Sequence, residues 1–117
     1  MILLFTVTSC YFTTTKEYTD SLSFTDRGVY FDDADNHVVS IEAPDGYTII
    51  TYTADGTNPT MKSTQYAPEH YYCTDNEFHD GILVRKGDMI KAAGYKNKKS
   101  ESESSTYVRT RIGEFSF

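Results

Sequence analysis

Tyr52-Thr53-Ala54-Asp55-Gly56-Thr57-Asn58-Pro59-Thr60 is the stretch that decides the fold of this chain. It follows a β-prone run at 46–51, so we expect a strand to end near the start of the stretch. Asp55-Gly56 supplies a residue that tolerates positive φ, and Asn58-Pro59 keeps the next residues out of a helix. The sequence therefore predicts a strand followed by a hard turn. The structural residues of this turn are Asp55, Gly56, Thr57 and Pro59.

Short β-prone segments with turn residues between them recur on both sides of this stretch. Several alternate apolar and polar residues, which is typical of a strand with one buried and one exposed face. The predicted strands are 21–25, 29–31, 37–43, 47–53, 82–84, 89–96 and 106–112. Turns are predicted at 26–28, 32–36, 44–46 and 86–88, an irregular stretch from the central turn to Gly81, and a polar tip from Asn97 to Ser105. No helix of useful length is expected, so the fold class is all-β: an immunoglobulin-like antiparallel β-sandwich of about seven strands.

Length and composition agree with one β-rich domain. The chain has 117 residues, with 10 Tyr, 7 Phe and no Trp, and a chain of this size can bury a core without help from a metal or a disulfide. The formal net charge is −6. Because nucleic-acid phosphates select a basic surface, this charge argues against a nucleic-acid partner.

The N-terminus carries a processing signal in one interpretation and a strand in another. Residues 1–9 are apolar and end in small residues before Cys10, a pattern that resembles a bacterial lipobox in which this cysteine is lipidated. No Lys or Arg precedes the apolar run, and alternating Leu3, Phe5 and Val7 would also suit a first strand. We predict a signal and polar tether at 1–20 and a sandwich domain at 21–117. Cys10 could instead be free or form a disulfide with Cys73.

Four markers in order resemble the small β-sandwich domain at the C-terminus of chitobiases and β-hexosaminidases. They are the segments 39–46, 50–60 and 89–94, and a polar tip before 106–112. In that family the central motif builds a turn and does no chemistry. The resemblance implies a non-catalytic accessory domain of a secreted or surface protein, because a separate domain performs catalysis in the enzymes that carry it. Residues 69–80 look like an insertion relative to the family pattern.

The segment around that insertion holds several potential metal ligands: His70, Cys73, Glu77, His79 and Asp80. Zinc would require four donors in a tetrahedron, and this spacing matches no known zinc pattern. The acidic segment 32–36, with Asp32, Asp33, Asp35 and Asn36, offers oxygen donors but lacks the glycine and distal glutamate of an EF-hand loop. We expect a packed surface loop and a solvated turn, and therefore no metal and no cofactor.

Tyr71, Tyr72 and Phe78 are the candidate ligand-binding residues. Aromatic rings stack on the apolar faces of sugars and peptides, and a tyrosine hydroxyl adds a polar group. Adjacent tyrosines on one strand would point to opposite faces, which would leave only one in a flat platform. The alternative is that these rings pack over the edge of the sandwich.

No catalytic motif is evident. No serine lies in a Gly-x-Ser-x-Gly elbow, and the three histidines have no evident paired nucleophile. We therefore expect that the chain is not an enzyme. The predicted function is an extracellular or cell-surface accessory domain of a bacterial lipoprotein or secreted protein, with a polysaccharide or surface protein as partner and membrane contact only through a lipid anchor on Cys10. The alternative is a protein–protein interaction module that uses the 66–81 loop or a sheet edge.

Overall fold

The computed structural model describes residues 21–99 and 105–117, so the predicted N-terminal segment and its boundary lie outside the described part. The described residues contain nine strands and no helix. They are β1 (Ser23–Val29), β2 (Asn36–Glu42), β3 (Ile49–Thr53), β4 (Thr64–Gln65), β5 (Glu69–Tyr72), β6 (Phe78–Arg85), β7 (Ile90–Lys99), β8 (Ser105–Arg109) and β9 (Gly113–Phe115). Within these residues no helix is long and apolar enough to span a membrane.

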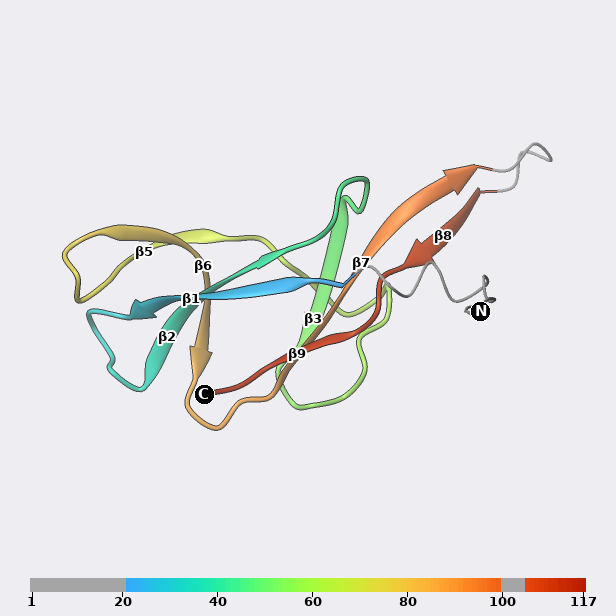
Figure 1. The fold of residues 1–117 in the computed structure, drawn as a ribbon. Helices are drawn as coiled ribbons and strands as arrows, with labels where there is room; N and C mark the ends of the chain where they lie inside the picture. Colours follow the sequence, from blue (N-terminus) through green and yellow to red (C-terminus); the bar gives the residue numbers. More distant parts are fainter. Residues whose placement is uncertain (1–20, 100–104) are drawn as a thin grey trace, which may run out of the picture.

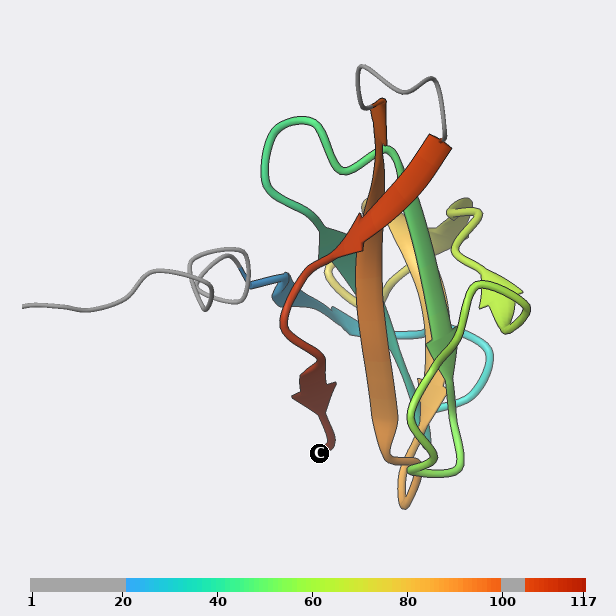
Figure 2. The same cartoon turned by 90° about the vertical axis from the view of Figure 1, so that its right-hand side faces the viewer.

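The strands form two antiparallel sheets. One has the order β1-β2-β6-β5, and the other has the order β4-β3-β7-β8 with β9 also pairing with β7. Figure 2 shows β3 running alongside β7 in the second sheet. The β5–β6 and β7–β8 hairpins lie at opposite ends of the molecule (Figure 1). The prediction of an all-β immunoglobulin-like sandwich is confirmed, with nine strands among residues 21–99 and 105–117 in place of about seven.

The core lies between the two sheets and is built from aliphatic residues. Its buried members are Leu22, Val39, Ile41, Ile82, Val84, Ile90 and Ala92. Val39 and Ile82 are direct cross-strand partners of β2 and β6, so the two strands place their apolar residues on the same face. At the margin, the rings of Phe24 and Phe115 stack with centroids 5.8 Å apart, which attaches β9 to the rest of the core.

The predicted turn at 26–28 is wrong: these residues lie inside β1. The register between β1 and β2 shifts between Asp26 and Gly28, which marks a β-bulge. Gly28 has φ +128°, and its backbone N–H donates a hydrogen bond to Asp26 Oδ1 at 3.0 Å. Glycine and aspartate suit a bulge for the same reasons that they suit a turn, so the local signal is shared by both structures.

The predicted irregular stretch up to Gly81 is also wrong. The polar tip predicted at 97–105 is wrong where it overlaps β7 and β8, and its residues 100–104 lie outside the described part of the chain. The stretch up to Gly81 contains β4, β5 and the first half of β6. In the predicted tip, β7 extends to Lys99 and β8 begins at Ser105. Polar residues occupy these strands because much of their surface faces solvent, so apolar alternation does not reveal them.

Strand β6 changes its partner half-way along. Its first half pairs with β5 up to Gly81, and its second half pairs with β2 from Ile82 onward. The end of β5 then meets the end of β1: Phe31 donates its backbone N–H to the carbonyl of Tyr72 at 2.9 Å, and Tyr30 forms a bridge with Cys73. The four-stranded sheet is therefore closed at this end, which brings the 30–31 segment against the β5–β6 hairpin.

Candidate binding site

In the central turn, the polar side chains form hydrogen bonds with other groups of the same turn. Asp55 Oδ1 accepts hydrogen bonds from the hydroxyl of Thr57 at 2.6 Å and from its backbone N–H at 3.1 Å. Of these, the hydroxyl contributes most to holding the pKa of Asp55 below its usual value. Gly56 takes φ +83°, and Pro59 is fully buried. These residues build a turn beside β3, and their groups are arranged to hold the backbone rather than a ligand.

An aromatic cluster of Phe31, Tyr72 and Phe78 lies on the outer surface of the β5–β6 hairpin. Tyr72 and Phe78 are direct cross-strand partners with ring centroids 5.0 Å apart. The ring centroid of Phe31 lies 5.3 Å from that of Tyr72. The two phenylalanines are 59% and 66% exposed. Large apolar side chains at this exposure, gathered around a tyrosine, are the kind of patch that marks a binding surface.

Tyr71 lies on the opposite face of β5 from this cluster. Its ring meets Tyr30 edge-on, with centroids 5.5 Å apart, and its hydroxyl donates to Glu69 Oε1 at 3.4 Å. Burial, with the nearby Glu69 carboxylate as the next cause, raises the pKa of Tyr71. The structure therefore brings Tyr72 and Phe78 together and places Tyr71 apart from them. Phe31, which the sequence did not single out, takes the third position.

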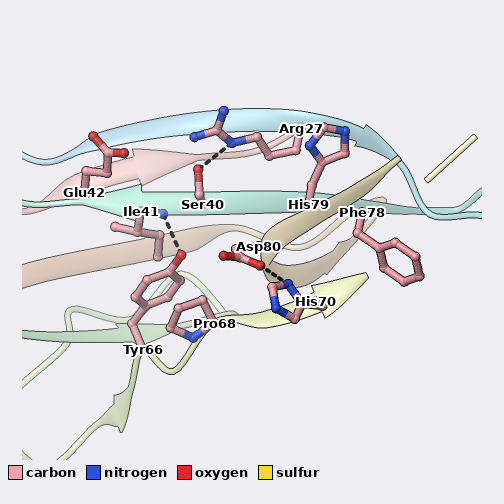
Figure 3. Close-up of a pocket in the computed structure, with 10 residues that line it drawn as sticks. All are labelled: Arg27, Ser40, Ile41, Glu42, Tyr66, Pro68, His70, Phe78, His79 and Asp80. Carbon is pink, nitrogen blue, oxygen red and sulfur yellow. Dashed lines mark hydrogen bonds and ion pairs between the residues drawn. The ribbon is translucent and has the colours of Figure 1, made fainter. Parts of the chain in front are cut away.

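A groove with a volume of about 500 Å³ runs beside the hairpin, and Phe78 belongs to both the groove and the aromatic cluster (Figure 3). The hydroxyl of Tyr66 accepts a hydrogen bond from the backbone N–H of Ile41 at 3.2 Å. Polar side chains surround this contact, among them the ion pair of His70 with Asp80. The residues that line the groove are Arg27, Ser40, Ile41, Glu42, Tyr66, Pro68, His70, Phe78, His79 and Asp80. The arrangement can make many hydrogen bonds next to an apolar ring.

The five potential metal ligands of the sequence do not form one site. Cys73 is a free, fully buried thiol, and its burial raises its pKa. His70 pairs with Asp80. Glu77 and His79 lie together, but with Asp75, which the sequence did not single out.

The acidic segment 32–36 is a turn. Asp33 Oδ1 accepts the backbone N–H of Asp35 at 3.0 Å, and Asp32 accepts the hydroxyl of Tyr30 at 3.3 Å. Cys10, the lipidation candidate, lies outside the described residues.

Comparison with protein families gives one match. The model of the family described as "Fn3 associated" matches residues 39–108, which is more than half of the chain. The chain belongs to the Fn3-associated family. The matched range runs from β2 into β8, includes the central turn and the β5–β6 hairpin, and supports a fibronectin-III-like accessory domain. No curated protein and no solved structure matches the chain.

Proposed function

We propose that this Fn3-associated domain is a non-catalytic module of a bacterial extracellular or cell-surface protein, and that it associates with polysaccharide through the aromatic cluster. One observation carries the proposal: Phe31 and Phe78 are 59% and 66% exposed, and the ring of each contacts the ring of Tyr72. The C–H faces of sugar rings stack on such side chains, and the hydroxyl of Tyr72 adds a polar group at their centre.

The ring geometry favours one kind of polysaccharide. The ring of Tyr72 is inclined by 63° to that of Phe31 and by 56° to that of Phe78. A flat crystalline surface would need coplanar rings, whereas single sugar units of a soluble chain can meet inclined rings one at a time. The groove that shares Phe78 supplies hydrogen-bonding groups beside these rings. We therefore expect a soluble, single-chain polysaccharide to bind better than a crystalline one.

The surface location rests on the sequence alone. The lipobox-like segment that ends at Cys10 and the resemblance to the C-terminal domain of chitobiases both support a module held outside the cell. A mass of the mature protein that begins at Cys10 and includes acyl groups would agree with this location. An unmodified Met1 start would contradict the lipid anchor.

Affinity electrophoresis through gels that contain a panel of soluble polysaccharides tests the proposal. We expect at least one polysaccharide to retard the wild-type domain. We expect the double change Phe31→Ala and Phe78→Ala to weaken binding at least about tenfold, the size of loss that follows when aromatic contacts of a binding surface are truncated. Tyr107→Ala is the matched control, because Tyr107 is an aromatic residue of β8, 49% exposed, at the opposite end of the molecule. Absence of retardation by every polysaccharide, or equal loss in the control, would reject the proposal.

A protein partner is the second candidate, and a different observation favours it. Beyond Val39, the edge of β2 that faces the groove has no paired strand among the described residues, and the Tyr66 hydroxyl occupies the N–H of Ile41. An added strand could take the place of this hydroxyl. A stoichiometric partner whose binding strengthens in Tyr66→Phe, which leaves the N–H of Ile41 open, would support this mode. Unchanged binding in that variant would contradict it.

A further inference from the structure

Three metal-binding side chains converge at the turn that joins β5 to β6. They are Asp75, Glu77 and His79, and one ligand atom from each lies within 4.8 Å of the others. This turn is at the left of Figure 1, at the end of the hairpin that carries Tyr72 and Phe78. The set differs from the five donors that the sequence suggested, because folding separates Cys73, His70 and Asp80 from it and adds Asp75.

The backbone of the turn holds this arrangement in place. Asp75 Oδ1 accepts the backbone N–H of Glu77 at 3.0 Å, and Asn76 between them adopts φ +69°. Cys73 donates its backbone N–H to the carbonyl of Glu77 at 2.9 Å, which closes the hairpin. His79 follows on β6, so the three donors come from alternate residues of one hydrogen-bonded turn.

The charges of these groups leave an attraction for a cation. Asp75 Oδ2 lies 2.8 Å from His79 Nε2. The carboxylate of Glu77 has no hydrogen bond or ion pair with any of the described residues. Two carboxylates therefore lie close together with one imidazole, and like charges at short range repel. An ion between them would remove this repulsion.

We propose that Asp75, Glu77 and His79 together bind one divalent transition-metal ion, with Zn²⁺ the preferred ion. An imidazole nitrogen with two carboxylates suits zinc, whereas Ca²⁺ and Mg²⁺ favour shells made only of oxygen. Zinc bonds of about 2.0–2.2 Å place tetrahedral donors roughly 3.3–3.6 Å apart. Asp75 Oδ2 and His79 Nε2, which lie 2.8 Å apart, must therefore separate slightly, and the ion would replace the hydrogen bond between them. The exposed Glu77 carboxylate supplies the third donor, within 4.8 Å of the other two. Three protein donors leave the fourth position to water or to a ligand oxygen.

This site is independent of the polysaccharide proposal, although the two meet in the same hairpin. The Tyr72 hydroxyl donates to Asn76 Oδ1 at 3.2 Å, so the central ring of the aromatic cluster is tied to the turn that the ion would hold. A bound ion would stiffen the segment between Tyr72 and Phe78. The role is one of binding and structure and involves no reaction.

Calorimetric titration of the chelator-treated full chain with ZnCl₂ alone tests the proposal, with CaCl₂ and MgCl₂ as comparisons. We expect one Zn²⁺ per chain and an affinity at least about tenfold weaker in His79→Asn and in Glu77→Gln, in line with losses seen when metal-site groups are removed. Asp75→Asn keeps the Oδ1 acceptor that shapes the turn but loses the charge, so it should fold and bind weakly. Zn²⁺ should also raise the melting temperature of the wild type and not of these variants.

His70→Asn is the matched control, because His70 is an exposed histidine of the same hairpin outside the proposed site. Its zinc affinity should equal that of the wild type. Three results would overturn the proposal: no zinc binding, binding that survives both His79→Asn and Glu77→Gln, or an equal loss in His70→Asn. The last would show adventitious binding to surface histidines.

Discussion

Gly81 lies at the point where β6 leaves β5 and begins to pair with β2, and replacing it with alanine should destabilise the domain strongly. A Cβ atom at this position would lie 2.5 Å from the carbonyl oxygen of Val39 and 3.1 Å from Cγ1 of Val38. The first obstacle is backbone and cannot rotate away. The two strands would have to separate to admit the methyl group.

The size of the effect follows from this overlap. Carbon and carbonyl oxygen normally approach no closer than about 3.3 Å, so the backbones must move apart by roughly 0.8 Å. Overpacking of this kind costs about 1–3 kcal/mol, and we expect the upper end because backbone must move. For a domain of about 100 residues, 3 kcal/mol corresponds to a fall in melting temperature of roughly 12–24 °C.

The assay is thermal unfolding followed by circular dichroism, with Gly87→Ala as the matched control. Gly87 has φ +98° but nothing within 4 Å of an added Cβ, so its substitution brings conformational strain and no clash. A strained backbone of this kind costs about 1–2 kcal/mol. The reasoning is refuted if Gly81→Ala melts at or above the temperature of Gly87→Ala. Failure of Gly81→Ala to fold agrees with it only when Gly87→Ala folds.

Two further predictions concern hydrogen bonds. Thr110→Val should lower the free energy of unfolding by about 1–3 kcal/mol in urea titrations. Thr110 Oγ1 accepts a hydrogen bond from the buried backbone N–H of Gly94 at 2.8 Å, and the variant leaves that N–H unpaired. Thr110→Ser should lose less stability, and equal losses in the two variants would contradict the role of the hydroxyl. Thr57→Val should raise the pKa of Asp55, measured by NMR titration, toward the ordinary value of 3.8, because the Thr57 hydroxyl is the main cause of its lowering. Because the pKa of Asp55 is lower in the folded state, the stability that this carboxylate contributes is present above the unfolded pKa near 3.8 and is lost as the pH falls through the folded pKa. This loss of stability at low pH should be smaller in Thr57→Val. An unchanged pKa in the variant would show that the hydroxyl is not the cause.

The fold was predictable in the strands whose apolar residues alternate in sequence, although β2 and β7 are buried on both faces. Val39 and Ile41 of β2 and Ile90 and Ala92 of β7 lie in the core as their alternation predicts. The β5–β6 hairpin was not predicted, because exposed polar residues make up most of it. The turn-prone residues Asp75-Asn76 could have located its turn, where Asn76 adopts a positive φ. A short hairpin with solvent on both sides leaves little periodicity to detect.

The site was predictable only in part, for a topological reason. Tyr72 and Phe78 are close in sequence, and their pairing follows once the hairpin is recognised. Phe31 reaches Tyr72 because the ends of β1 and β5 pair, a contact between distant segments that no local pattern contains. In the same way, Asp75 became a candidate ligand only when the turn placed its carboxylate beside His79.

The closure of the four-stranded sheet has a consequence for association with other chains. Exposed strand edges present unpaired N–H and C=O groups that can recruit a further strand and lead to edge-to-edge aggregation. Where Phe31 donates to the carbonyl of Tyr72 and Thr74 donates to that of Val29, the edges of β1 and β5 satisfy each other. Backbone pairing with a second molecule is blocked at this end. Any partner that meets the aromatic cluster must recognise its side chains.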